Sequence, residues 1–239
     1  MRIDLQVGGY AIRLDESAGH ACLRWPFAAF EPFAAPAGRV PDLLVEVHIV
    51  RRLPALPHGP LVYDACHGLW KWHEADDGYL LASPHRRTGE PDAVALISRD
   101  IARVRVWKLA RRGGGPAGLA WEPMHVINPI VEACLLTRLG RDGGALLHAA
   151  GVATERGGLA FTGASGAGKS TLAQFYAERG ASVLSDERLI LRAVGQGTQV
   201  FGTPWPGAGG HARNGQAPLS AVFCIRHGRD GHVLRPMAP

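Results

Sequence analysis

The sequence predicts an α/β (α+β) protein with a β-rich N-terminal domain over residues 1–118 and a second domain, built around a glycine-rich loop, over residues 119–239. Three observations support this prediction. Short segments that alternate apolar and polar residues fill the first part of the chain, as half-buried strands do. Residues 111–118 contain three consecutive glycines and are typical of a linker. After them, strand-like and helix-like segments surround the glycine-rich loop.

Period-two patterns and turn residues mark the expected strands of the N-terminal domain. Gly8-Gly9 joins two alternating segments, residues 3–7 and 10–14, into a hairpin. Residues 26–41 are rich in Pro and Ala and predict a loop. Further strands are expected at residues 43–50, 67–74, 79–83, 93–98 and 101–108.

A helix with clear end signals is expected at the start of the second domain. Asn128 is a preferred N-cap, Pro129 suits the first helical position, and Gly140 suits the end of the helix. A second helix should cover residues 171–179 and stop at Gly180. Strands are expected at residues 145–153, 158–162, 181–184, 189–194 and 219–226.

Composition limits the partners and the compartment. The net charge of +5 comes mostly from scattered arginines, which argues against a nucleic-acid partner. The four cysteines are isolated, so reduced thiols in a cytoplasmic protein are expected, without zinc or disulfides. No apolar run approaches 18 residues, so no membrane association is expected. The sequence does not decide whether the protein forms a homo-oligomer.

The glycine-rich loop carries the clearest chemical signal. It fits G-x-x-x-x-G-K-[ST], a pattern whose backbone N–H groups surround phosphates while the lysine reaches the outer ones. The strand before it and the helix after it supply the context that this motif needs. The chain has three lysines, and one stands in this loop. We therefore expect ATP and Mg²⁺ as ligands, held by Gly163, Ala164, Ser165, Gly166, Ala167, Gly168, Lys169, Ser170 and Thr171.

Two carboxylates follow the next expected strand. Asp186 and Glu187 stand where side chains emerge beside a bound triphosphate. One of them can accept a proton from a hydroxyl while the other, together with Ser170, orients Mg²⁺. His148 lies in an apolar segment, where a lone histidine is either a core residue or a catalytic one.

These residues resemble the catalytic core of HPr kinase/phosphorylase and its relatives. The resemblance rests on His148, the loop GASGAGKST and the segment Ser185-Asp186-Glu187-Arg188, and it covers about residues 125–226. It implies a P-loop kinase core of the type shared with phosphoenolpyruvate carboxykinase. Asp186 would be the base for a seryl hydroxyl, Glu187 the carboxylate on the metal side, and His148 a neighbour of the transferred phosphoryl group. Lys169 and Ser170 would contact phosphate and Mg²⁺. The N-terminal part is similar to that of HPr-kinase-like proteins and lasso-peptide kinases.

Departures from the family pattern bear on the substrate. Glu187 stands where relatives often have Asp, and Thr171 stands where HPr kinases usually have Glu. The segment E-x-R-G-x-G, which supports action on HPr, does not occur, so HPr itself and phosphorylase activity are disfavoured. The chain stops soon after residue 226, where relatives continue, so we expect a truncated sequence or a partner that completes the site.

The function expected from the sequence is ATP-dependent transfer of a phosphoryl group to a Ser or Thr hydroxyl of a peptide or protein. Residues 203–216 are rich in Gly and Pro and form either a substrate flap or a surface loop. As a flap, their Trp205, His211 and Arg213 would suit a peptide that carries a carboxylate. A small-molecule kinase of the free-serine or adenylylsulfate type and a non-catalytic ATP-binding scaffold remain as alternatives.

Overall fold

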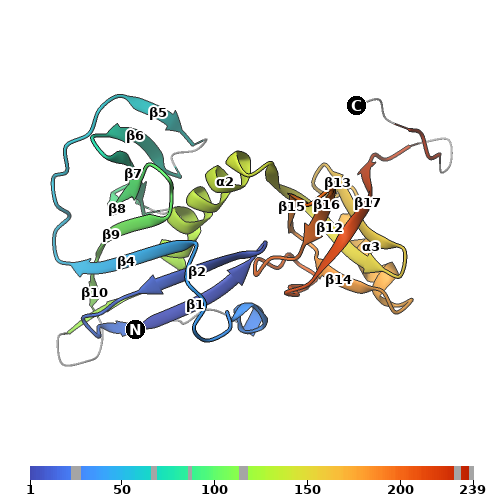
Figure 1. Cartoon of the computed structure of the whole chain (residues 1–239), viewed down its shortest axis with the longest axis horizontal. Helices are drawn as coiled ribbons and strands as arrows, with labels where there is room; N and C mark the ends of the chain where they lie inside the picture. The colour runs from blue at the N-terminus through green and yellow to red at the C-terminus, as the bar shows by residue number, and fades with distance from the viewer. Residues whose placement is uncertain (23–27, 66–68, 86–87, 113–117, 229–232, 237–239) are drawn as a thin grey trace. The chain divides into compact units, whose positions relative to one another are not determined.

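The computed structural model describes residues 1–22, 28–65, 69–85, 88–112, 118–228 and 233–236 (Figure 1). The chain divides into two compact units, Met1–Leu146 and Leu147–Pro239. Residues 119–146, which the sequence assigned to the second domain, belong to the first unit. Most of the predicted linker, residues 113–117, lies outside the described residues.

The predicted α/β (α+β) class, with a P-loop kinase core of the HPr kinase and phosphoenolpyruvate carboxykinase type, is wrong. Strands account for 48% of the structure and helices for 15%, in large mixed sheets. Three α-helices occur among the described residues: α1 (Met124–Val126), α2 (Glu132–Arg141) and α3 (Lys169–Ala177). The physical reason is that most strands are joined by tight hairpins, so helices do not alternate with strands along the chain.

The first unit contains an eight-stranded sheet in the order β1-β2-β4-β9-β8-β7-β6-β5. Its inner strands β2, β4 and β9 pair in parallel, and the other pairs are antiparallel. A small second sheet has the order β10-β11-β3. The bounds are β1 (Arg2–Val7), β2 (Tyr10–Asp15), β3 (Ala21–Cys22), β4 (Leu43–Val50), β5 (Leu61–Asp64), β6 (Lys71–Ala75), β7 (Gly78–Pro84), β8 (Pro91–Ser98), β9 (Arg103–Leu109), β10 (Arg111–Arg112) and β11 (Leu119–Trp121).

The strands expected in this unit are present with small shifts. Gly8 and Gly9 have φ of 58° and 85°, as a tight hairpin turn requires, and they join β1 to β2. Strand β4 buries every second residue, as its sequence pattern predicts. The segment expected as a loop at residues 26–41 contains one 3₁₀ helix, η1 (Ala28–Phe33). The strand expected from His67 begins at Lys71, and residues 66–68 lie outside the described part.

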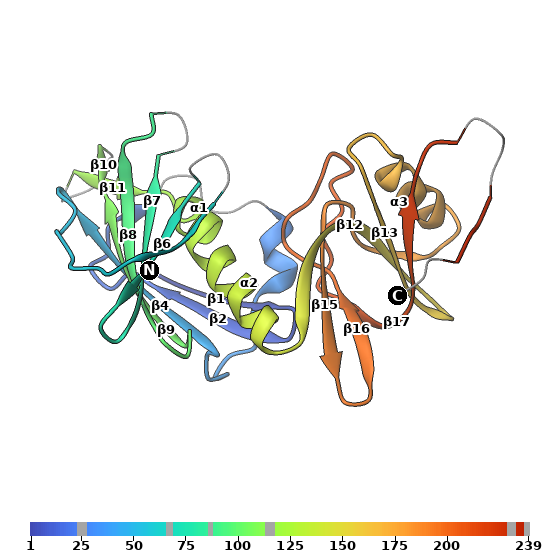
Figure 2. The ribbon, with the colours of Figure 1, turned by 90° about the horizontal axis from the view of Figure 1, so that it is seen from above.

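The first predicted helix exists, but its ends differ from those expected. Asn128 is not an N-cap, because it lies with φ −109° and ψ 108° inside a π-helical segment, η3 (Ile127–Val131), between α1 and α2. Helix α2 continues through Gly140 to Arg141. Packing explains the extension, since α2 buries four residues on one side and lies against the eight-stranded sheet (Figures 1 and 2): Ala133, Cys134, Leu135 and Leu139.

The second unit is a sheet that closes on itself. Its strand order is β13-β17-β16-β15-β12-β14, and β13 also pairs with β12, so five strands form a ring to which β14 adds. A Cβ on Gly158 of β13 would collide with Val200 of β16, so glycine allows this close approach inside the ring. The bounds are β12 (Gly144–Thr154), β13 (Gly157–Gly163), β14 (Ser182–Ser185), β15 (Arg188–Val194), β16 (Gly197–Phe201) and β17 (Gln216–Ile225).

Two hydrophobic clusters stabilise this unit. One joins strands around the ring and contains Ala149, Ala160, Leu184, Leu189, Val200 and Ala217. The other packs α3 onto the sheet and contains Ala150, Val152, Phe161, Ala173 and Val183.

Across the described part of the chain, no helix is long and apolar enough to cross a membrane.

A buried ion pair lies between β8 and β9 in the first unit. The Nζ of Lys108 donates to Oδ1 of Asp92 at 2.7 Å and to the backbone oxygen of Leu109 at 3.2 Å. Lys108 is fully buried. Burial lowers the pKa of its amine, and the adjacent Asp92 carboxylate opposes that shift. The buried ammonium of Lys108 is therefore stabilised by the carboxylate of Asp92.

We predict that Asp92→Ala lowers the free energy of unfolding by about 3–5 kcal/mol, because it leaves the Lys108 ammonium buried without its carboxylate. The matched control is Asp64→Ala, which breaks an exposed pair with Lys71 at 3.7 Å and should cost about 0–1 kcal/mol. Urea unfolding of both variants measures the difference. Equal losses would contradict this description of the pair.

Candidate functional site

The glycine-rich loop connects the end of β13 at Gly163 to the start of α3 at Lys169. The strand, loop and helix therefore follow in the predicted order. Gly163 has φ 152°, and a Cβ there would lie 2.6 Å from the backbone oxygen of Ile225. Gly168, at the N-cap of α3, is left-handed with φ 96°. Glycine is required at both positions, because a side chain would clash at Gly163 and would strain the left-handed backbone at Gly168. The loop then leads directly into the N-terminus of α3.

Lys169 is folded into the loop. Its Nζ donates to the backbone oxygens of Gly163 at 3.0 Å and Ala164 at 3.1 Å, and the residue is 7% exposed. The loop thus keeps a positive charge at its centre, next to the N-terminus of α3. Backbone carbonyls compensate this charge, and they are weaker partners for an ammonium than phosphate oxygens are.

A hollow of about 310 Å³ lies beside the loop. Its other wall is the end of β17, which pairs in parallel with β13 so that Cys224 lies opposite Thr162. The Nε2 of His227 lies 3.1 Å from the backbone oxygen of Gly166. Sequence reasoning missed this wall, because the parallel register of β17 is a long-range feature. The hollow is lined by Gly163, Ala164, Ser165, Ala167, Cys224, Ile225, Arg226 and His227.

Strand β12 brings the loop and the Asp186-Glu187 pair to one edge of the sheet. Both β13 and β14 are antiparallel to β12, so they run in the same direction and end at the same edge. Ala149 of β12 lies opposite Thr162 of β13, and its N–H donates to the backbone oxygen of Glu187 at 3.1 Å. Two strand spacings, about 10 Å, therefore separate the two groups across the sheet.

The side chains of His148 and Glu187 lie next to each other at this edge and form an ion pair when the imidazole is protonated. The Nδ1 of His148 lies 3.3 Å from Oε1 of Glu187, and the side chains are 54% and 37% exposed. His148 is therefore not a core histidine, although it lies in an apolar strand. A solvated imidazole and carboxylate beside the glycine-rich loop can accept protons or orient a cation.

Asp186 is buried, in contrast to Glu187. It is 1% exposed, and its carboxylate accepts three backbone hydrogen bonds from the glycine-rich segment downstream. Gly207 and His211 donate to Oδ1 at 2.9 and 3.2 Å, and Gly209 donates to Oδ2 at 2.6 Å. Asp186 therefore anchors residues 207–211 over itself.

The remaining residues predicted for the flap have different surroundings. Trp205 is buried, and the guanidinium carbon of Arg188 lies 5.8 Å from its ring centroid. Arg213 is exposed, while its backbone N–H donates to the oxygen of Leu184 at 2.9 Å. Trp205 thus fastens the start of the segment instead of forming an exposed apolar plate, and the side chain of Arg213 faces solvent.

The predicted Mg²⁺ ligands are Ser170 and Glu187. Ser170 lies in the first turn of α3, directly after Lys169, and is partly buried. Within the described ranges, no group of three or more His, Cys, Asp or Glu side chains is placed to hold a metal ion. Magnesium bound with a nucleotide needs one or two protein oxygens, since phosphates and waters supply the rest. A hydroxyl and a carboxylate of this kind fit that requirement.

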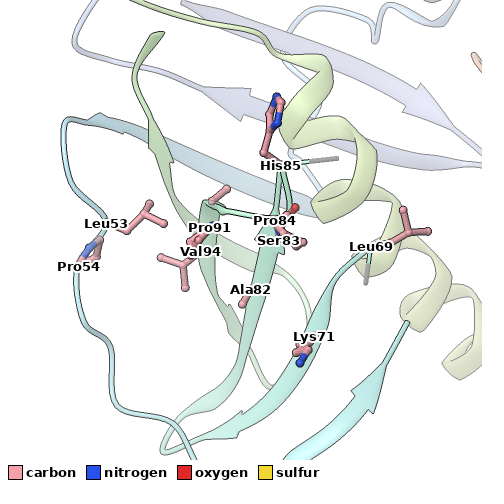
Figure 3. A pocket seen from close by; sticks show the side chains of 12 residues that line it. Leu53, Pro54, Leu69, Lys71, Ala82, Ser83, Pro84, His85, Pro91 and Val94 are labelled. Atoms are coloured by element: carbon pink, nitrogen blue, oxygen red, sulfur yellow. The ribbon is translucent and has the colours of Figure 1, made fainter. Parts of the chain in front are cut away.

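A larger cavity, of about 820 Å³, lies in the first unit. Figure 3 shows its lining on the strands β6, β7 and β8, with Leu53 and Pro54 at one side. Among the described residues, most of the lining is apolar, and Lys71 contributes a lysine side chain. None of the residues predicted for the site lines this cavity.

The two carboxylates can be compared by matched substitutions. We predict that Asp186→Asn lowers the free energy of unfolding by about 2 kcal/mol or more, because an amide nitrogen cannot accept the N–H groups that the carboxylate accepts. Glu187→Gln should cost less than about 1 kcal/mol, since its ion pair is solvated. Thermal or denaturant unfolding measures both. A larger loss in Glu187→Gln would contradict the anchoring role of Asp186.

Comparison of the sequence with models of protein families and with curated proteins gave no match. The functional argument therefore rests on the geometry of the loop, of Asp186 and of the His148–Glu187 pair.

Proposed function

We propose that this chain is an ATP-dependent phosphotransferase that passes the γ-phosphoryl group to a Ser or Thr hydroxyl of a peptide or protein. One observation carries the proposal. The glycine-rich loop and the Asp186-Glu187 segment follow β13 and β14, the two strands that flank β12, at the same edge of the sheet, with His148 on β12 between them. The resemblance of these three segments to HPr kinase/phosphorylase points to the same chemistry.

Phosphate binding would use groups that the loop already presents. The N-terminus of α3 favours an anion. The loop N–H groups would add donors, except that of Ala167, which donates to the backbone oxygen of Ala164 at 3.1 Å. Lys169 lies at the centre of the loop, where its Nζ would exchange the carbonyls of Gly163 and Ala164 for phosphate oxygens. A charge-assisted bond to phosphate is stronger than one to a neutral carbonyl, which favours this exchange.

Ser170 and Glu187 would hold Mg²⁺ together with the nucleotide. The bound ion supplies neutralisation of the charge on the phosphate oxygens during transfer. Glu187 would be oriented by its ion pair with His148, whose exposed imidazole faces the same edge. His148 would thus lie near the transferred phosphoryl group, as the resemblance implies.

Asp186 would accept the proton of the acceptor hydroxyl. The hydroxyl oxygen forms a bond to the γ-phosphorus as the bond from that phosphorus to the ADP oxygen breaks, and the proton passes to the carboxylate.

Arg213, exposed on the segment that covers Asp186, would bind a carboxylate of a peptide acceptor. A cytoplasmic location is part of the proposal, because the four cysteines are isolated in the sequence.

One observation favours the alternative of a non-catalytic ATP-binding scaffold. Asp186 is 1% exposed and its carboxylate already accepts three N–H groups, so an acceptor hydroxyl cannot reach it in the state described.

A measurement of turnover distinguishes the kinase from the scaffold. Labelled ATP incubated with the protein and a lysate should transfer its label to peptide or protein, and label in a small metabolite would point to a small-molecule kinase.

We predict that Lys169→Ala weakens binding of ATP with Mg²⁺ about tenfold or more and abolishes transfer, because it removes the cation at the loop centre. Lys71→Ala, which changes a lysine of the other unit, is the control and should bind ATP normally. Calorimetric titration measures both affinities. Unchanged affinity in a folded Lys169→Ala protein would remove the basis of the proposal.

A second prediction concerns the acceptor. Arg213→Ala should raise the acceptor KM about tenfold and leave the ATP KM within about twofold, because it removes a charge-assisted contact to the acceptor. Arg156→Ala, in the exposed turn between β12 and β13, is the matched control. Steady-state kinetics with the labelled peptide measure the two constants. An unchanged acceptor KM would argue against peptide recognition by Arg213.

A further inference from the structure

The segment Gly207–His211, which we name the glycine strap, covers the carboxylate of Asp186. Alternate residues of the strap, Gly207, Gly209 and His211, point their N–H groups at the two carboxylate oxygens at 2.6–3.2 Å. The donors lie 21 to 25 positions along the chain from Asp186. These bonds are therefore tertiary contacts that close a loop, and they can open without disrupting a strand.

Close contact explains the glycines at two strap positions. A Cβ on Gly209 would lie 2.7 Å from Oδ2 of Asp186, and one on Gly207 would lie 2.9 Å from the same atom and 3.1 Å from Oε2 of Glu187. Neither residue has φ in the left-handed region, so the backbone angle does not require glycine there. The absence of side chains lets the strap reach the two carboxylates.

Both ends of the strap are fixed independently of Asp186. Before it, Trp205 is buried. After it, Ala212 forms an isolated β-bridge with Ser185, and Arg213 donates its N–H to Leu184. Within the strap, Gly210 donates to Gly207 at 3.1 Å. The ends of the strap are fixed, and its middle is held mainly by the carboxylate of Asp186. A loop of this kind can move away from the residue it covers while its ends stay in place.

The geometry points to a gate: the glycine strap closes over Asp186 and controls access of solutes, including the phosphoryl acceptor, to that carboxylate. Asp186 is then a positioning residue for the strap in the closed state and becomes available to a hydroxyl when the strap leaves. The purpose of the gate rests on the proposed phosphotransfer. The closure itself does not, so it can be tested without any acceptor.

Labelling of carboxylates with a water-soluble carbodiimide and glycine ethyl ester tests the closure, with mass spectrometry to locate the label. In the unaltered protein, Glu187 should react and Asp186 should be protected, in line with their exposures. Gly209→Ala places a methyl group against Asp186 and should raise its labelling at least fivefold. Gly207→Ala should act in the same way. Gly197→Ala, whose Cβ would meet nothing within 4 Å, is the control.

The outcomes separate the gate from the proposed function. Labelling of Asp186 as fast as Glu187 in the unaltered protein, or no gain in both strap variants with the fold intact by circular dichroism, would overturn the gate. If the gate holds, transfer to the labelled peptide should rise about threefold in kcat in Gly209→Ala, with the ATP KM unchanged. Increased labelling of Asp186 without transfer by any variant would retain the closure and reject the phosphotransferase.

Discussion

The pairing of β12 with strands on both of its sides is the constraint on which the rest of the second unit depends. Its C-terminal half pairs with β13 on one side and β14 on the other, and this sets β13 and β14 in the same direction. The loop that follows β13 and the carboxylates that follow β14 must then emerge at one edge. His148 lies on β12 at that edge, so one strand positions all three groups.

Local elements were predictable from the sequence, while the fold class was not. Gly8-Gly9 specifies a hairpin turn, and the alternation in residues 43–50 specifies a half-buried strand, because both signals lie within a few residues. Which strands pair is decided by contacts far apart in the chain. The parallel pairing of β17 with β13 brings together segments about sixty residues apart, and no local pattern announces it. Because the sequence does not reveal those pairings, the strand-loop-helix motif led to the prediction of an α/β core, which the structure does not have.

The candidate site shows the same division. The loop at residues 163–171 is a contiguous motif, so its place between a strand and a helix follows from the sequence. The surroundings of Asp186 do not, because its partners are backbone N–H groups of Gly207, Gly209 and His211, which any residue except proline could supply. Only the run of glycines hinted at close contact. His148 was ambiguous in the sequence, and its pairing with Glu187 indicates a polar role.

The central claim is that the loop at residues 163–171 binds the phosphates of ATP. Backbone amide chemical shifts measure this most directly, because the N–H groups themselves are the proposed donors. On addition of ATP with Mg²⁺, the amides of residues 164–170 should shift in a saturable way, and adenosine at the same concentration should leave them in place. Shifts of equal size with adenosine, or none with ATP, would contradict phosphate binding by this loop.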